Sequence, residues 1–364
     1  MPRKKTKIGV IFGGKSAEHE ISLQSARNII DALDKKKYDV VLIGIDKSGQ
    51  WLFDADATRL LDPSRSASAK KLIAPHSRPS MAVRGSTALE NADVRGAAGN
   101  ANVIFPVLHG PYGEDGSMQG LLRIAGLPFV GAGILGSAVG MDKDVMKRLL
   151  RDAEIPTAKF VTIRDRDKIS FRHIIRTLGL PVFVKPANLG SSIGVEKTKN
   201  RGELATAVKR AFQYDSKILI EEEIAGREIE CSVLGNEDPA ASLPGEVIPT
   251  HEFYSYDAKY TDPDGARVDI PAKIPARTVR TVQKMAIETF KALNCEGMAR
   301  VDFFLKPNGE LLVNEINTIP GFTAISMYPK LWEASGLSYS ALLDRLIDLA
   351  VERFNREKKL KSSR

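Results

Sequence analysis

The chain has 364 residues and 43% of them are apolar, which is enough for two or three domains with buried cores. Its net charge of +8 would suit a nucleic-acid-binding protein, but this charge lies at the ends of the chain. Residues 1–7 carry four positive charges, and residues 352–364 carry six positive against two negative, which gives +4 and +4. The body is therefore neutral. Short basic tails are typical of solvated chain ends, so we expect no nucleic-acid partner.

The cysteine content and the hydropathy pattern indicate where the protein works. Two cysteines, Cys231 and Cys295, are too few for a disulfide framework and favour a reducing compartment. The apolar run Ile8–Phe12 is too short for a signal peptide. No segment reaches the roughly 20 apolar residues that a membrane-spanning helix needs. We therefore expect a cytoplasmic protein.

The first third of the chain predicts parallel strands joined by a helix. Ile8–Phe12, Tyr38–Asp46 and Asn102–Leu108 are short apolar runs typical of buried strands, and residues 22–33 have helical periodicity. A β-α-β start of this kind implies a parallel sheet with right-handed crossovers. Residues 55–101 are rich in Ala, Ser and Arg, and predict an irregular, exposed insertion.

Two further units follow the insertion. The second is predicted to contain a helix over Met141–Asp152, strands near Thr157–Ile163 and Pro181–Pro186, and a helix over Gly202–Phe212. The strand Lys217–Ile224 leads to a third unit with a helix over Arg277–Leu293, a hairpin, and a closing helix over Tyr339–Phe354. We therefore predict an α/β fold with three domains, over residues 1–135, 136–224 and 225–364.

The hairpin over residues 298–317 carries the densest set of polar candidates. Its strands alternate apolar and polar residues on either side of a turn at Pro307–Gly309. Pairing Leu305 with Glu310 sets Arg300 opposite Glu315 and Asp302 opposite Val313. Because side chains alternate faces, one face would carry Arg300, Asp302, Glu315 and Asn317, and the core face Ala299, Val301, Phe303, Leu305, Leu312 and Ile316. Oxygen donors beside a guanidinium suit a hard divalent cation that holds phosphates, although a solvated sheet face is the simpler alternative.

Two familiar nucleotide motifs are present but do not fit their expected contexts. Gly9–Ser16 satisfies the Walker A pattern, but Val10, Ile11 and Phe12 belong inside the first strand, so the remaining loop is too short to surround a phosphate. This argues against a P-loop NTPase. Gly131–Gly136 matches the dinucleotide fingerprint outside the first β-α unit, and a tight loop before a helix explains it equally well. We do not expect an NAD-dependent oxidoreductase.

A lysine, a glycine-rich segment and an acidic strand form a more consistent set. Within Val184–Gly194, Lys185 ends an apolar strand, and the Gly- and Ser-rich residues after it predict a flap over phosphates or, more simply, a turn. Lys143, near the start of a predicted helix, could reach the same anion. Glu221–Glu223 end the next strand. They or Glu228 could bind an adenine amino group or a ribose hydroxyl, or the three acids could form a solvated edge.

This order of lysine strand, flap, acidic strand and carboxylate hairpin resembles the ATP-grasp superfamily. Residues 13–26, 109–120, 253–260 and 314–332 specifically resemble the D-alanine–D-alanine ligase family, and the resemblance extends from Lys7 to about Phe354. It implies a Rossmann-like N-terminal domain, a two-subdomain ATP-grasp fold and a homodimer. It also implies ATP-dependent joining of two D-alanines for peptidoglycan synthesis, with release of ADP and phosphate. A related D-alanine–D-serine or D-alanine–D-lactate ligase is the alternative, and a basic nucleic-acid-binding protein of the same fold is a more distant one.

The resemblance also implies which residues bind the nucleotide and its metal ions. Lys143 and Lys185 would contact the α- and β-phosphates, Lys259 the γ-phosphate during transfer, and Glu221, Glu222, Ile224 and Glu228 the remainder of the nucleotide. Asp302, Glu315 and Asn317 would hold two Mg²⁺ or Mn²⁺ ions between the phosphates.

A second set of implied residues binds the amino acids. Glu18 would bind the ammonium of the first D-alanine, with His109 either orienting it or serving a structural role. Arg300 and the backbone N–H of Gly321 would stabilise the oxyanion, and Ser326 and the backbone of Met327 would receive the second carboxylate. Tyr260 would link through Ser191 to Glu18 and close the flap. A tyrosine at this position favours an amine as the second nucleophile.

Overall fold

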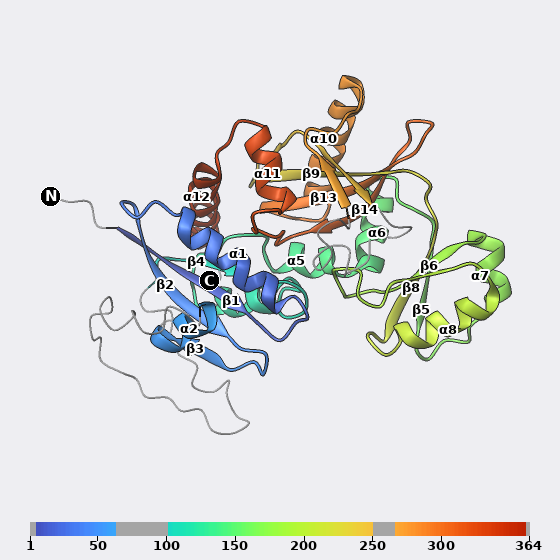
Figure 1. Cartoon of the computed structure of the whole chain (residues 1–364), viewed down its shortest axis with the longest axis horizontal. Helices are drawn as coiled ribbons and strands as arrows, with labels where there is room; N and C mark the ends of the chain where they lie inside the picture. Colours follow the sequence, from blue (N-terminus) through green and yellow to red (C-terminus); the bar gives the residue numbers. More distant parts are fainter. Residues whose placement is uncertain (1–4, 63–100, 250–265, 362–364) are drawn as a thin grey trace.

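The computed structural model describes residues 5–62, 101–249 and 266–361. Within these ranges the chain forms three β-sheets with helices packed against them (Figure 1). The mixture of a mainly parallel sheet with antiparallel sheets confirms the predicted α/β class. In the same ranges, no helix is both long and apolar enough to cross a membrane.

The first sheet is built from the N-terminal segment. Its order is β3-β2-β1-β4, made by β1 (Thr6–Gly13), β2 (Tyr38–Ile45), β3 (Trp51–Phe53) and β4 (Val103–Val107). β1 runs parallel to β2 and β4, and β3 adds an antiparallel edge. α1 (His19–Ala32) connects the first two strands and α4 (Ser117–Ile124) follows β4. Val10, Ile11 and Phe12 lie inside β1, as expected, so the Walker A pattern forms no phosphate loop.

One end of the predicted irregular insertion is helical. α2 (Asp54–Leu61) packs against β2 and buries Ala57 and Leu61. These two side chains are four residues apart and lie on one helix face, while Asp54 and Asp56 occupy the first turn, where acids are favourable. The prediction of irregular structure is therefore wrong for residues 55–61. Residues 63–100 lie outside the described ranges.

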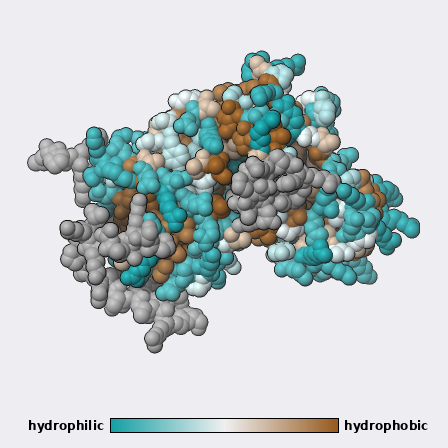
Figure 2. All heavy atoms as spheres, in the orientation of Figure 1, coloured by the Kyte–Doolittle hydropathy of each residue, from teal (hydrophilic) through white to brown (hydrophobic). Residues whose placement is uncertain are grey.

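The second sheet is antiparallel and has the order β5-β8-β6-β7. Its strands are β5 (Phe160–Arg164), β8 (Lys217–Glu222), β6 (Val182–Pro186) and β7 (Glu196–Thr198). α7 (Phe171–Leu178) and α8 (Arg201–Ala211) bury their apolar faces against it. On the face of the molecule that Figure 2 shows, this part is mainly hydrophilic.

The third sheet is also antiparallel and has the order β12-β11-β9-β13-β14, with β10 beside β9. Its strands are β9 (Arg227–Gly235), β10 (Ala240–Ala241), β11 (Gly245–Pro249), β12 (Ala266–Asp269), β13 (Gly297–Leu305) and β14 (Leu311–Asn317). α10 (Ala276–Ala292) covers its apolar face. α11 (Met327–Ala334) and α12 (Tyr339–Lys358) follow, and α12 shares a core with the first sheet through Leu342 and Leu346.

Two helices between the first and second sheets pack on the third. α5 (Ile134–Met141) contacts β14, and α6 (Lys143–Asp152) places Met146 and Leu150 in the core of the third sheet. α6 starts two residues later than predicted because the Asp142 side chain accepts a hydrogen bond from Val145 N and caps it. The predicted division at residues 135 and 224 stays a prediction.

The glycine-rich segment Gly131–Gly136 has a packing role. α5 begins inside it, at Ile134. A Cβ at Gly136 would lie 2.7 Å from the carbonyl oxygen of Asn294, so only glycine allows α5 to approach that loop so closely. The resemblance to a dinucleotide fingerprint is explained by this contact.

The hairpin forms, but in a different register from the predicted one. Its closing pair is Leu305 with Leu311, so Arg300 faces Asn317 and Asp302 faces Glu315. A β-bulge leaves Asn314 without an opposite residue, and this extra residue shifts the later part of β14. The core face is consequently lined from β14 by Leu311, Val313 and Ile316, whereas Leu312 lies opposite Phe304 on the other face. Placing Leu312 on the core face was wrong.

Candidate active site

The polar face of the hairpin holds a compact ion-pair network. Arg300 Nε and Nη2 donate to the two carboxylate oxygens of Asp302, each at 2.7 Å, and Asn317 Nδ2 donates to Asp302 Oδ2 at 3.0 Å. Arg300 Nε also lies 2.9 Å from Glu230 Oε2, on the neighbouring strand β9. Burial alone would lower the pKa of Arg300, but the charges of Asp302, Glu230 and Glu315 raise it well above its usual range. The guanidinium therefore stays charged.

The oxygen donors on this face suit a metal ion that shares its ligands with a substrate. Among the described residues, no group of three His, Cys, Asp or Glu side chains forms a complete metal cage. Asp302 and Glu315 are opposite each other in the sheet, and Asn317 adds an amide. Mg²⁺ usually binds one or two carboxylates and completes its shell with water and phosphate oxygens. Two carboxylates and an amide fit that pattern.

Lys143 connects the hairpin to the predicted flap. It is the first residue of α6, and its Nζ donates to the carbonyl oxygen of Leu189 at 2.6 Å. The same ammonium lies 3.9 Å from Glu315 Oε2. A cavity of about 20 Å³ at this point is lined by Glu114, Gly140, Met141, Lys143, Gly190, Glu315, Ile316, Asn317 and Thr318. The ammonium group of Lys143 therefore lies between the carboxylate face of the hairpin and the predicted flap.

Lys185 lies beside the buried carboxylate of Glu221, and this pairing was not predicted from the sequence. Its Nζ is 2.6 Å from Glu221 Oε2, and the other oxygen of Glu221 is 3.3 Å from Lys147 Nζ. Burial would raise the pKa of Glu221, but the two lysines lower it to about 2. Glu221 is only 3% exposed, so it is not part of a solvated edge. Lys147 was not among the predicted residues.

The other members of the acidic strand have separate environments. Glu222 Oε1 accepts a hydrogen bond from Lys159 N at 2.8 Å, and Glu223 pairs with Lys197 at 2.8 Å. Ile224 and Glu228 are half-buried, and Glu228 lies on β9 opposite Phe304. The strand β8 itself ends at Glu222.

The flap also reaches the N-terminal part of the molecule. Ser191 Oγ donates a hydrogen bond to Glu18 Oε1. Glu18 is the N-cap residue of α1, in the segment that follows the last residue of β1, Gly13. Ser191 and Ser192 have φ angles of 52° and 58°, in the left-handed region that favours glycine. Lys259 and Tyr260, the remaining predicted members of this group, lie outside the described residues.

The loop between β14 and α11 brings two further predicted residues together. Ser326 is the N-cap residue of α11, and its Oγ accepts a hydrogen bond from Thr323 N at 2.9 Å. A Cβ at Gly321 would lie 2.8 Å from Ser326 Oγ. Glycine therefore leaves room for the serine hydroxyl, and Met327 follows as the first residue of the helix.

His109 and Glu114, which both follow β4 in the sequence, connect this loop to the first sheet. The carbonyl oxygen of Ile319 accepts a hydrogen bond from His109 Nδ1 at 3.1 Å, and Ile319 N donates to Glu114 Oε1 at 3.2 Å. Gly110 N donates to the other oxygen of Glu114 at 2.7 Å. Burial, with the nearby charge of Glu18, raises the pKa of Glu114 to about 8. Sequence reasoning missed Glu114, although the polar, glycine-rich run around it was visible.

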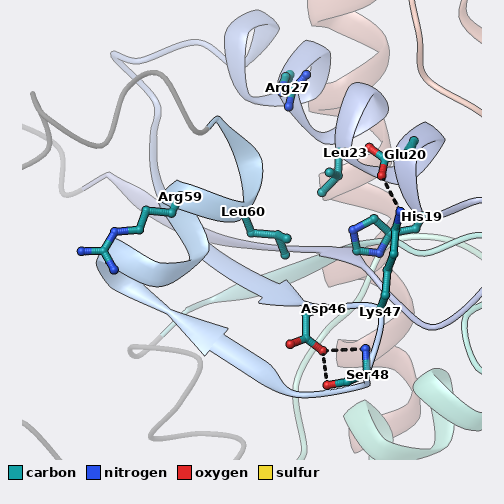
Figure 3. A pocket seen from close by; sticks show the side chains of 9 residues that line it. All are labelled: His19, Glu20, Leu23, Arg27, Asp46, Lys47, Ser48, Arg59 and Leu60. Carbon is teal, nitrogen blue, oxygen red and sulfur yellow. Dashed lines mark hydrogen bonds and ion pairs between the residues drawn. The ribbon is translucent and has the colours of Figure 1, made fainter.

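A separate cavity of about 500 Å³ lies against the first sheet (Figure 3). Its lining comprises His19, Glu20, Leu23, Arg27, Asp46, Lys47, Ser48, Arg59 and Leu60. Glu20 and Lys47 pair with each other at 2.9 Å, and Asp46 accepts a 2.6 Å hydrogen bond from the Ser48 hydroxyl. This cavity includes none of the predicted site residues.

Comparisons with known proteins agree with this geometry. Residues 7–132 match the model for the D-ala D-ala ligase N-terminus, and residues 149–348 the model for its C-terminus. The D-alanine–D-alanine ligase of Oceanobacillus iheyensis is 52% identical over 371 residues, covering 99% of each chain. The solved D-alanine–D-alanine ligase of Coxiella burnetii has a TM-score of 0.82 at 40% identity, covering 98% of this chain and 96% of that one.

A further solved structure is that of a D-alanine–D-alanine ligase from Bacillus anthracis complexed with ATP. Its TM-score is 0.74 at 29% identity, with 97% of this chain and 99% of that one covered. These structural neighbours are ATP-grasp enzymes, so the predicted fold class is confirmed. Because both family models match and together span most of the sequence, this chain belongs to the D-alanine–D-alanine ligase family.

Proposed function

We propose that this chain uses ATP to join two D-alanines into D-alanyl-D-alanine for peptidoglycan synthesis, releasing ADP and phosphate. The observation that carries this proposal is the position of the flap. Lys143 links the flap to Glu315 on the hairpin, while Ser191 links it to Glu18. A cation for phosphate, carboxylates for metal and a carboxylate for an ammonium group therefore surround one space. This is the combination that a carboxylate–amine ligation requires.

In this proposal the lysines and the hairpin bind the nucleotide. The Bacillus anthracis relative was solved in complex with ATP, which supports the same substrate here. Lys143 and Lys185 would contact the α- and β-phosphates, and Lys259 the γ-phosphate during transfer. Glu222, Ile224 and Glu228 would line the rest of the nucleotide site. Asp302, Glu315 and Asn317 would hold two Mg²⁺ or Mn²⁺ ions, which would neutralise phosphate charge.

The reaction itself has two steps. The carboxylate of the first D-alanine attacks the γ-phosphate and gives an acyl phosphate and ADP. The amine of the second attacks the acyl carbonyl, and the tetrahedral intermediate expels phosphate. Glu18 would hold the first ammonium, and Arg300 with Gly321 N–H would stabilise the oxyanion. Ser326 and the backbone of Met327 would receive the carboxylate of the second D-alanine.

A direct assay tests the proposal. The full-length protein should release phosphate from ATP only when D-alanine and Mg²⁺ are present, and D-alanyl-D-alanine should be detected by mass spectrometry. D-cycloserine, which mimics D-alanine, should compete. Absence of both phosphate release and dipeptide, with the protein folded, would reject the function.

The identity of the second substrate is the finer part of the proposal. A panel of D-alanine, D-serine and D-lactate distinguishes the alternatives, and we expect D-alanine to have the highest kcat/KM. Tyr260→Phe should raise the D-lactate to D-alanine ratio, because the hydroxyl link to the flap would be lost. An unchanged ratio would contradict that role for Tyr260.

The remaining features of the proposal concern the whole protein. We propose a homodimer in the cytoplasm, with three domains over residues 1–135, 136–224 and 225–364. The three sheets support this division, although α5 and α6 pack against the third sheet. Sedimentation equilibrium would test the dimer.

A further inference from the structure

Lys147 is a lysine that the protein encloses completely. It follows Lys143 by one helical turn on α6, so the two side chains share a face of that helix. The Lys147 side chain is 0% exposed, and its Nζ lies 3.3 Å from Glu221 Oε1 on β8. The ring of Phe160, on β5, is 5.9 Å from the same ammonium. An ammonium enclosed in this way is costly unless a carboxylate compensates it, and Glu221 does so.

The carboxylate of Glu221 is divided between two lysines. One oxygen faces Lys147 and the other is 2.6 Å from Lys185 Nζ. Lys185 is the most accessible of the three, with 13% of its side chain exposed against 3% for Glu221 and 0% for Lys147. Two ammonium groups and one carboxylate sum to a charge of +1. Of these three side chains, Lys185 is therefore the one that a ligand can contact most easily.

Sharing the carboxylate changes what Lys185 offers to an anion. If Glu221 faced Lys185 alone, the two would form a neutral one-to-one pair. With Lys147 holding the other oxygen, the carboxylate cannot turn wholly toward Lys185, and the network keeps its net positive charge. A net charge close to a phosphate attracts it more strongly than a neutral pair does, particularly where little water is present.

We infer that Lys147 is a positioning residue of the nucleotide site, which holds Glu221 so that Lys185 keeps the charge and direction needed to bind nucleotide phosphates. This inference rests on the proposed ATP-dependent function. The competing explanation is that Lys147 only stabilises the fold as half of a buried ion pair. That explanation predicts a loss of stability without any change in preference for phosphorylated ligands.

The test compares a ligand that has phosphates with one that lacks them. Lys147→Met keeps the unbranched stem and removes the charge. In calorimetric titrations of the full chain with Mg²⁺ present, we expect ATP to bind about tenfold more weakly and adenosine to change less than twofold. Tenfold corresponds to about 1.4 kcal/mol. In turnover, KM for ATP should rise with little change in KM for D-alanine.

Two further variants make the test depend on charge and not on packing. Glu221→Gln raises the network from +1 to +2, and the double variant Lys147→Met with Glu221→Gln returns it to +1. The ATP-to-adenosine affinity ratio should therefore be lowest in Lys147→Met, similar in the double variant and the wild type, and highest in Glu221→Gln. If Lys147→Met does not fold, the other two variants still carry the comparison.

Arg151→Met is the matched control, because it removes the same charge from an exposed position on the same helix. Its affinity ratio should equal that of the wild type. A wild-type ratio in Lys147→Met, or ratios that do not follow the network charge, would overturn the inference. A wild-type protein that releases no phosphate from ATP and D-alanine would instead reject the proposed function.

Discussion

At the scale of single residues, the charged side chains of the hairpin face pair with one another. Asp302 accepts hydrogen bonds from both Arg300 and Asn317, and Glu230 gives the guanidinium a second carboxylate. A metal ion that takes up Asp302 would therefore leave Arg300 with Glu230 as its partner. Glu315 Oε2 lies 3.9 Å from Lys143 Nζ, so this carboxylate connects the hairpin face to α6.

Replacing Glu315 tests the carboxylate face directly. Glu315→Gln should lower kcat by at least about a hundredfold, because the amide cannot supply the negative charge that a divalent cation requires. Its melting temperature should remain close to that of the wild type. Glu310→Gln, which changes an exposed glutamate at the turn of the same hairpin, should be neutral. Near wild-type phosphate release by Glu315→Gln would refute the metal assignment.

Glu114 gives the protein a specific dependence of stability on pH. Burial raises its pKa from 4.5 to about 8, so between these values the folded state holds a proton that the unfolded chain has lost. Stability should therefore fall as pH rises through this interval. In Glu114→Gln, which cannot ionise, urea denaturation should show a decline between pH 5 and pH 8 that is smaller by about 3 kcal/mol. Parallel curves for the two proteins would show that Glu114 does not titrate in this way.

At the scale of elements, a bulge and a strained flap build the site. The extra residue Asn314 allows Leu311 and Val313 to face the core while Glu315 faces the polar side with Asp302. A regular strand would put all three on one face. The alternation pattern alone does not reveal a bulge, which explains why the predicted register was wrong although the polar face was identified.

Substitutions in the predicted flap should change the binding of the first D-alanine. Ser191→Ala removes the hydrogen bond to Glu18 and should raise KM for D-alanine at least about tenfold, because hydrogen bonds to charged groups contribute about 1.5–3 kcal/mol. Ser192→Ala removes a hydroxyl from the next residue, which has the same left-handed backbone. Steady-state kinetics of the two variants separate the roles. An equal rise in both would point to a general loosening of the flap.

At the scale of the whole molecule, the C-terminal helix attaches the third sheet to the first. The predicted basic tail begins at residue 352, but α12 continues to Lys358 and Arg353 is only 3% exposed. Its guanidinium donates to the carbonyl oxygens of Gly131 and Phe129, at 2.5 and 2.8 Å, and covers the Phe129 ring. Part of the segment interpreted as a solvated tail is therefore helical, and its Arg353 is buried and connects distant parts of the chain.

Removing the hydrogen bonds of Arg353 should lower the stability of the protein without abolishing its catalytic activity. Arg353→Met would leave two carbonyl groups without their donor, and we expect about 2–4 kcal/mol less free energy of unfolding. Arg345→Met, which removes an exposed arginine from the same helix, should cost less than about 0.5 kcal/mol. Urea denaturation gives both values. A cost for Arg353→Met as small as that of the control would contradict the structural role.

The amino-acid sequence by itself determined the strands, the main helices and the order of the segments that carry the candidate site residues. Apolar periodicity and residue spacing are local properties, and they were sufficient to place Arg300, Asp302 and Asn317 on one face. The tertiary structure alone decided which charges meet. Lys147 and Glu221 are far apart in sequence, as are Arg353 and Gly131, and their contacts depend on how separate elements pack. Burial then sets the cost of each charge, which no local pattern encodes.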